Sequence, residues 1–260
     1  ISNICAEDNR VKLISQKNLG VVEARRNGLN NASGDYIALV DADDYIEIKA
    51  IENAIKLIIY DDVESAVWEL YSTDGVSERE LISYEQDKII ISGDEAFLRT
   101  LGKWKVTGLG VFLKTNYLQA YNKYDSAEFN SFNADEYISR VALLTSKRVG
   151  LIKSKYFYFV NPLSATRHFN PSWLGRVDTC KALIALLKEK GIYTSSKNYI
   201  IDEVVSNIIL LKRAWGSNKS SIKPFEYHSY IECCNALMNS FSLVDYFCWL
   251  LSSTTSIKKK

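Results

Sequence analysis

The first part of the chain alternates between short apolar runs and helical patterns. Strands are predicted for residues 11–14, 35–40 and 65–71, which are apolar runs of strand length. Between them, residues 21–31 and 47–59 place apolar side chains at the spacing of an amphipathic helix. This alternation of strands and helices predicts an α/β fold with a parallel sheet.

The same reading continues to about residue 171 and then changes. Further strands are predicted at residues 88–91, 111–113 and 149–152, and helices at residues 95–101 and 135–146. Beyond Pro171 the pattern is helical only, over residues 174–190, 200–215 and 227–251. We therefore predict two parts, an α/β domain over residues 1–171 and a helical C-terminal region over residues 172–260.

Composition narrows the class of protein. Hydrophobic residues make up 47% of the 260 residues, which argues against disorder, and the formal net charge of +1 argues against a general nucleic-acid binder. The apolar runs end well short of the roughly 20 residues that span a bilayer. The five cysteines form no zinc-type pairs, so we expect reduced thiols in a cytoplasmic protein.

An acidic cluster is the most informative local feature. An apolar strand over residues 36–40 leads directly into Asp41, Asp43 and Asp44. Open α/β sheets bind ligands at the carboxyl ends of their strands, and carboxylate oxygens suit Mg²⁺ or Mn²⁺ shared with a phosphate. A solvated loop that caps the next helix explains the same residues equally well.

Two other readings of this cluster can be tested on its residues. An EF-hand beginning at Asp41 would require glycine where Ile46 stands, so that reading fails. A phosphatase of the haloacid dehalogenase type also begins with an apolar strand and Asp-x-Asp, but Tyr45 and Ile46 replace its small and hydroxyl residues. The phosphatase remains a minor alternative.

A set of motifs in fixed order carries a stronger signal. The motifs are Asn18-Leu-Gly20, Ala24-Arg25 with Gly28, Ala32-Ser-Gly34-Asp35-Tyr36-Ile37, and Asp41-Ala-Asp43-Asp44. In order and spacing they resemble the central block of family 2 glycosyltransferases over residues 16–46. Segments near residues 133–136, 156–158 and 164–167 resemble later motifs of that family, so the resemblance covers about residues 5–168.

The resemblance implies a GT-A fold, which is a Rossmann-like mixed, mostly parallel sheet flanked by helices. It implies inverting transfer of a sugar from a nucleotide diphosphate donor, expected to be UDP-linked, to a saccharide acceptor. The resemblance is to bacterial enzymes of surface-polysaccharide and O-antigen assembly, in which the acceptor is often lipid-linked. The implied cofactor is a divalent metal, Mn²⁺ or Mg²⁺.

On the donor side, the family pattern assigns roles to four residues. Asp43 is the expected direct metal ligand, and Asp41 is expected to support the metal or the ribose. Arg25 and Arg167 are expected near the nucleotide and its diphosphate, where cations neutralise charge. A surface role for either arginine remains open.

On the acceptor side, the resemblance places the catalytic base at Asp135, which would take the proton of the attacking hydroxyl. Asp135 also has the position of a helix cap. Ala134 replaces an acid that the family usually has, and Glu136 is the alternative base at the acceptor site. Trp104 is expected to stack on the acceptor sugar, although a buried aromatic residue is equally consistent.

Two departures leave alternatives open. The first βα unit of the family, which recognises the nucleotide, has no counterpart here, so we expect an N-terminally incomplete domain and keep a catalytically inactive GT-A-like binding module as an alternative. The aromatic, apolar stretch at residues 241–251 fits either a core-packing helix or a peripheral anchor on the cytoplasmic face of a membrane. An unpaired sheet edge leaves homo-oligomer formation open.

Overall fold

The structure is a computed structural model that describes residues 5, 7–126, 133–160, 170–218 and 224–257. A curled sheet of seven strands forms its centre. The strands are β1 (Tyr36–Ala38), β2 (Tyr45–Ile46), β3 (Ser65–Thr73), β4 (Glu78–Ile82), β5 (Lys88–Ser92), β6 (Gly110–Leu113) and β7 (Arg148–Phe159). Their order is β1-β6-β3-β7-β2, with β4 added to β3 and β5 added to β7.

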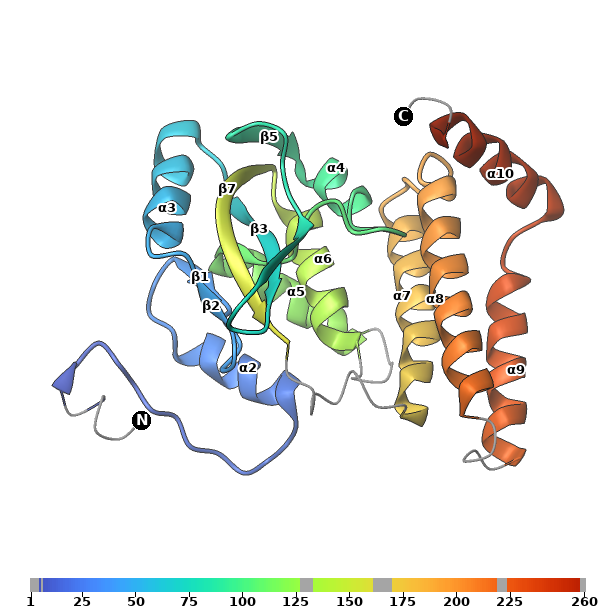
Figure 1. The fold of residues 1–260 in the computed structure, drawn as a ribbon, viewed down its shortest axis with the longest axis horizontal. Coiled ribbons are helices and arrows are strands. Elements are labelled where there is room, and N and C mark those ends of the chain that lie inside the picture. Colours follow the sequence, from blue (N-terminus) through green and yellow to red (C-terminus); the bar gives the residue numbers. More distant parts are fainter. Residues whose placement is uncertain (1–4, 6, 127–132, 161–169, 219–223, 258–260) are drawn as a thin grey trace.

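Helices cover both faces of this sheet (Figure 1). One face packs against α3 (Ala50–Asp61), and the other packs against α4 (Gly93–Leu98), α5 (Lys114–Ser126) and α6 (Ala134–Thr145), with α2 (Val21–Asn31) beside α5. In the central strand β3, Val67 joins the core on the α6 side and Trp68 joins the core on the α3 side. This two-faced burial explains why residues 65–68 contain no charged side chain.

The α/β class and most predicted elements are confirmed, but the sheet is less parallel than we expected. Only the ladder between β3 and β7 is parallel among the described strands, and the other ladders are antiparallel. The physical reason lies in the connections. The chain passes from β3 to β4 through a short turn, which gives an antiparallel pair, whereas the parallel strand β7 follows helices α5 and α6, which provide a long crossover.

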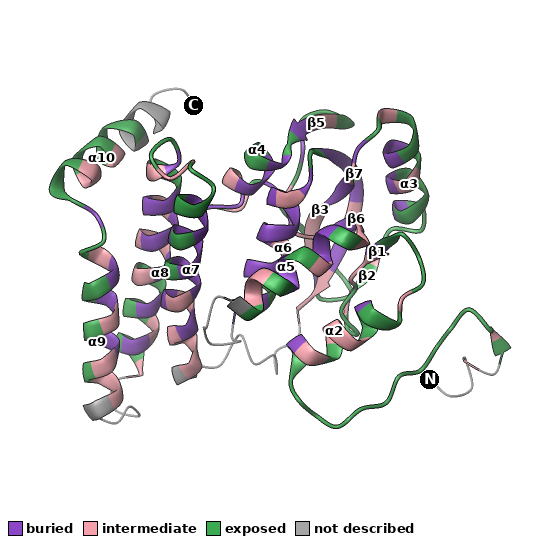
Figure 2. Ribbon diagram, turned by 180° about the vertical axis from the view of Figure 1, so that it is seen from behind, coloured by how far each residue is buried: buried purple, intermediate pink, exposed green. Residues whose placement is uncertain are grey.

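The strand expected at residues 11–14 is wrong. These residues have no strand assignment, and all side chains from residue 11 to residue 20 are exposed. The segment runs along the outside of the molecule (Figures 1 and 2). A β-rich sequence becomes a strand only when a neighbouring strand satisfies its backbone groups, and no described strand lies beside this one.

The helix predictions were more accurate than the strand prediction at residues 11–14. The first predicted helix has the observed bounds of α2. Ser92 and Glu95 have the sequence spacing of a capping box, and the Ser92 hydroxyl accepts a hydrogen bond from the Glu95 amide at 3.2 Å at the start of α4.

The C-terminal region is helical, as predicted. A short 3-10 turn, η2 (Pro171–Leu174), leads into α7 (Gly175–Glu189), α8 (Lys197–Ser217), α9 (Pro224–Met238) and α10 (Leu243–Ile257), so the single helix predicted over residues 227–251 is two helices. The buried faces of α6, α7 and α8 join in one continuous apolar cluster (Figure 2). The elements before η2 are strands and helices, those after it are helices, and the two parts share a core. The domain boundary at residue 171 stays a prediction.

The last helix has two different sides. Tyr246 and Trp249 pack towards the core, and the Trp249 indole donates to Asp202 of α8 at 3.3 Å. The opposite side exposes apolar residues, namely Leu243, Val244, Phe247, Leu250 and Leu251. No helix in the described part of the chain is long and apolar enough to cross a membrane. The expected contact with a membrane surface remains a prediction.

A glycine in β6 provides a test of the sheet. A Cβ atom at Gly110 would lie 2.2 Å from the Ala66 carbonyl oxygen and 2.7 Å from the Val67 Cα atom, so β3 and β6 approach more closely than any side chain permits. We expect Gly110→Ala to lower the free energy of unfolding by about 1–3 kcal/mol in urea denaturation. The control Gly28→Ala has open space and should stabilise α2 by up to about 1 kcal/mol. Equal stability of Gly110→Ala and the unsubstituted chain would contradict the close approach.

Candidate functional site

A cavity of about 630 Å³ opens at the ends of the central strands. Its walls come from α2, the loop after β1, strands β3, β4 and β7, the segment before β6, and helices α5 and α6. The lining residues that carry polar or aromatic chemistry are Arg25, Asp41, Asp44, Trp104, Tyr117, Tyr121, Asp135, Glu136, Tyr156 and Tyr158. Asp41 and Asp44 of the acidic cluster and the predicted acceptor-side residues therefore share one cavity.

Arg25 joins the two sides of this cavity. Its Nη2 atom donates to Asp41 Oδ1 at 2.6 Å, and its Nη1 atom lies 3.9 Å from Asp135 Oδ2. The helix α2 brings Arg25 to the cavity, while the loop after β1 and the first turn of α6 bring the two carboxylates. Three residues from distant parts of the sequence thus form one charged group, with the cation between two anions.

The loop of the acidic cluster is held by β7. The Tyr156 hydroxyl donates to Asp44 Oδ2 at 2.6 Å and accepts from the Asp41 amide at 3.2 Å, and the Phe159 amide donates to Asp44 Oδ1 at 2.8 Å. Burial raises the pKa of the Asp44 carboxyl, and the Tyr156 and Phe159 hydrogen bonds oppose that rise. Asp44 therefore anchors the loop and has both carboxylate oxygens engaged.

Asp41 and Asp43 are the acids that remain for a metal ion. Both are exposed, and Asp43 lies outside the cavity lining. No three metal-binding side chains come together in the described residues. Two carboxylates fit an ion that completes its coordination with water and substrate phosphate, which is the usual mode for Mg²⁺. A closed protein cage does not fit these residues.

The acceptor-side residues Trp104 and Glu136 form the other wall. Trp104 is half-buried and its ring lies 4.4 Å from the guanidinium carbon of Arg140. The Glu136 carboxylate lies 3.8 Å from Arg140 Nη1 and 3.6 Å from Arg176 Nη1. Burial raises the pKa of the Glu136 carboxyl, while the nearby Arg140 and Arg176 charges oppose that rise.

The structure brings together most of the predicted site residues. Arg25, Asp41, Trp104, Asp135 and Glu136 all line the cavity. Arg167 lies outside the described residues.

The capping alternative for the proposed base is not observed. The N-cap residue of α6 is Asn133, which makes no side-chain capping bond, and Asp135 lies one residue inside the helix with an exposed side chain. The Asp135 carboxylate is therefore directed towards Arg25 and the cavity rather than used by the helix backbone.

Two contributors were missed in the sequence. Tyr156 entered the sequence analysis only within the segment 156–158 that resembles a later family motif, although the alternation of Tyr156 and Tyr158 places both on the cavity side of β7. Arg140 stands four residues after Glu136 on the apolar face of α6, and it is fully buried. The sequence signal that could have identified Arg140 was a charged residue at a position on the apolar face of a predicted helix.

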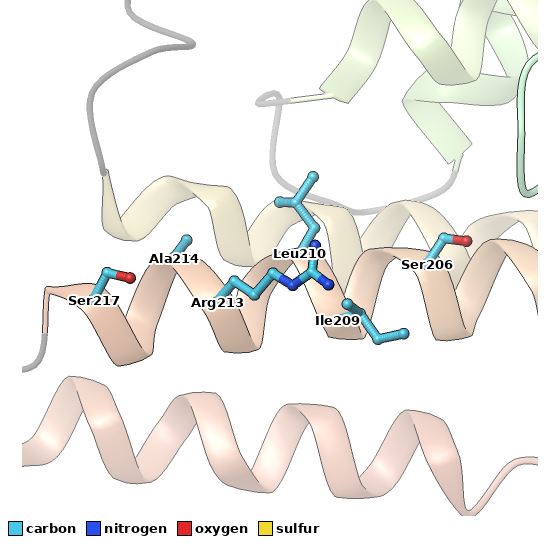
Figure 3. A pocket seen from close by; sticks show the side chains of 6 residues that line it. All are labelled: Ser206, Ile209, Leu210, Arg213, Ala214 and Ser217. Atoms are coloured by element: carbon cyan, nitrogen blue, oxygen red, sulfur yellow. The ribbon is translucent and has the colours of Figure 1, made fainter.

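A second hollow lies on the outer surface of α8 (Figure 3). Its lining residues are Ser206, Ile209, Leu210, Arg213, Ala214 and Ser217. It contains one charged side chain and no carboxylate, thiol or histidine. The large cavity therefore remains the candidate site for chemistry.

Comparison with known families decides what kind of site this is. Residues 1–123 match the family model described as glycosyl transferase family 2. This match covers 123 of the 260 residues, and over that part the chain is similar to family 2 glycosyltransferases. The matched region includes Arg25, the acidic cluster and Trp104, whereas Asp135, Glu136 and the C-terminal helices lie beyond it.

Two curated glycosyltransferases of Streptococcus pneumoniae serotype 4 are similar in sequence. GlyA is 27% identical over 236 residues, which are 86% of this chain and 34% of GlyA. GlyG is 28% identical over 176 residues, which are 64% of this chain and 58% of GlyG. The chain thus spans about a third of one relative and somewhat more than half of the other.

Solved structures of S. aureus TarS are similar in fold. The crystal structure of TarS residues 1–349 with UDP-GlcNAc superimposes with a TM-score of 0.54 at 13% identity, covering 84% of this chain and 61% of that one. The corresponding structure with UDP gives a TM-score of 0.50 at 14% identity, covering 81% and 57%. The chain therefore has the expected GT-A fold.

The anchoring of the acidic loop gives a pH prediction. Tyr156→Phe removes a hydrogen bond that stabilises ionised Asp44, so we expect the pKa of the Asp44 carboxyl to rise further above its ordinary value. A carboxyl whose folded pKa is raised favours folding at low pH, and this contribution is lost as pH increases through the folded pKa. The variant should shift that loss to higher pH.

The measurement is a ¹³C NMR titration of the aspartate carboxyl carbons, combined with denaturation curves at several pH values. Tyr60→Phe is the matched control because Tyr60 is 82% exposed. An unchanged Asp44 titration in Tyr156→Phe would contradict the proposed anchoring.

Proposed function

We propose that this chain transfers a sugar from a UDP-linked donor to a hydroxyl of a saccharide acceptor, with inversion at the anomeric carbon. One observation carries the proposal: a single cavity joins Arg25 and Asp41 to Asp135, with Trp104 on the facing wall. The family 2 match supports glycosyl transfer, and the TarS complexes with UDP-GlcNAc and UDP support a uridine nucleotide.

On the donor side, Asp41 and Asp43 would hold Mn²⁺ or Mg²⁺. When bound there, the ion would act as a Lewis acid for the leaving diphosphate. Arg25 is placed to contribute a second positive charge, because its guanidinium already lies against Asp41 at the cavity wall. A diphosphate can take over this guanidinium at small cost, since exposed or half-exposed ion pairs contribute little stability.

On the acceptor side, Asp135 is the proposed base. The acceptor oxygen attacks the anomeric carbon, the bond from that carbon to the diphosphate breaks with its electron pair on the leaving oxygen, and Asp135 takes the hydroxyl proton. The exposed carboxylate of Asp135 is accessible for this step, and Arg25 Nη1 lies 3.9 Å from it. Glu136, on the same helix turn, is the alternative base.

The donor side is tested with Asp43→Ala. We expect Mn²⁺ to strengthen UDP binding to the unsubstituted chain. Because Asp43→Ala removes one of the two carboxylate ligands, we expect the factor by which Mn²⁺ increases the UDP affinity to fall by at least about tenfold. Isothermal titration calorimetry with UDP, with and without MnCl₂, measures this. Asp87→Ala is the matched control, since its side chain is 96% exposed and pairs only with Lys153 at 3.3 Å among the ion pairs of the described residues.

The same titration separates the alternatives. If UDP and Mn²⁺ do not enhance each other's binding to the unsubstituted chain, an inactive binding module is favoured over a transferase. Hydrolysis of para-nitrophenyl phosphate that disappears in Asp41→Asn would instead favour the phosphatase.

The acceptor side is tested with Asp135→Asn. We expect UDP binding to stay within about twofold, while release of UDP from the sugar donor falls by about 100-fold or more, because general base catalysis contributes on that scale. UDP-GlcNAc is the first donor to test, and UDP release is followed by a coupled assay. Glu136→Gln is measured in parallel. Full activity in Asp135→Asn with loss in Glu136→Gln would move the base to Glu136.

A further inference from the structure

A buried ion pair joins the acceptor wall to the C-terminal helices. Arg140 of α6 has no exposed surface, and Glu203 of α8 is buried beside it. Arg140 Nη1 and Nη2 donate to the two carboxylate oxygens of Glu203 at 3.0 and 3.1 Å. This paired geometry fixes the plane of the guanidinium as well as its position.

Glu203 also holds the segment that leads to Trp104. Its Oε2 atom accepts from the Gly102 amide at 2.7 Å, and Arg140 Nη2 donates to the Thr100 carbonyl at 3.2 Å. The side-chain amide of Asn207, one turn later in α8, donates to Glu203 Oε1 at 2.9 Å. The carboxylate is thereby fully engaged, and its position determines the course of the chain between α4 and Trp104.

On its cavity side, the Arg140 guanidinium supports both acceptor-wall residues. The Trp104 ring stacks over it with 4.4 Å between the guanidinium carbon and the ring centre, and the Glu136 carboxylate lies 3.8 Å from Nη1. Trp104 and Glu136 both line the cavity. One face of the Trp104 ring is therefore fixed by a cation, which favours the contact and limits rotation of the ring.

We propose that Glu203, acting through Arg140, is a positioning residue for Trp104 and Glu136, so that the C-terminal helices form part of the saccharide-binding wall. The saccharide contact of this wall rests on the proposed transfer. A buried ion pair is often no more stabilising than a well-packed apolar pair of similar volume. Its distinctive contribution here is the fixed geometry of the cation beneath Trp104.

Fluorine NMR on the chain labelled with 5-fluorotryptophan tests this. The resonance of Trp104 is assigned by its loss in Trp104→Phe. We expect it to shift by more than its line width in Glu203→Gln, because the neutral amide places an N–H group against Arg140. The resonance of Trp68, which packs on the α3 side of the sheet, should stay in place. Glu189→Gln is the matched control, because Glu189 forms a surface pair with Lys123.

A second variant separates positioning from simple stability. The double substitution Arg140→Met with Glu203→Leu removes both charges together, so no unpaired charge stays buried. Because the Gly102 amide and the Thr100 carbonyl lose a partner, we expect a lower thermal midpoint but a folded chain. We still expect a displaced Trp104 resonance. If the double variant restores the original resonance, or if Glu203→Gln leaves it unchanged, the positioning role is overturned.

UDP binding is measured on the same samples. It should remain within about twofold, because Arg25 and Asp41 make no described contact with the ion pair. Failure of UDP to bind the unsubstituted chain would contradict the proposed function, whereas the Trp104 resonance would still decide the positioning role.

Discussion

The Arg140 guanidinium has no contact with solvent, so its charge must be paired within the protein. The rest of the structure depends on this constraint. Burying an unpaired charge is costly, so the partners of Arg140 have to assemble around it in one arrangement. Those partners come from α8, from the segment after α4 and from Trp104. Separating the α/β part from the helical region would remove Glu203, the partner that binds Arg140 with both carboxylate oxygens, which agrees with the apolar core that the two parts share.

The two walls of the cavity are held in place by different kinds of interaction. The acceptor wall rests on the buried ion pair of Arg140 and Glu203 and so has a fixed geometry. The donor wall rests on Arg25 and Asp41, whose side chains are 24% and 52% exposed. It also rests on the acidic loop, in which the Tyr156 hydroxyl donates to only one of the three carboxylates, that of Asp44. Exposed pairs exchange partners at little cost. A charged donor that arrives with a metal ion can rearrange this wall, while the saccharide side keeps its shape.

Sequence patterns predicted the local features well. The α2 helix has the predicted bounds, Ser92 caps α4 as its spacing indicated, and the acidic cluster follows an apolar strand. Predictions that required a distant partner were less reliable. Residues 11–14 have strand composition but no neighbouring strand, and β6 runs antiparallel to β3 although the order of elements favoured a parallel sheet. Composition indicates which secondary structure a segment can adopt, whereas strand pairing depends on which segments lie beside it.

The sequence by itself determined the class of fold, the family resemblance and the identity of the carboxylates and cations that carry the proposed chemistry. These depend on residue type and on short spacings along the chain. Only the tertiary structure decided that Tyr156 and Phe159 are the partners of Asp44. It also decided that Arg25 lies between Asp41 and Asp135, and that Glu203 supports the wall around Trp104. Each of these relations joins residues from separate elements, because hydrogen bonds and ion pairs act over a few ångströms in space whatever the separation in sequence.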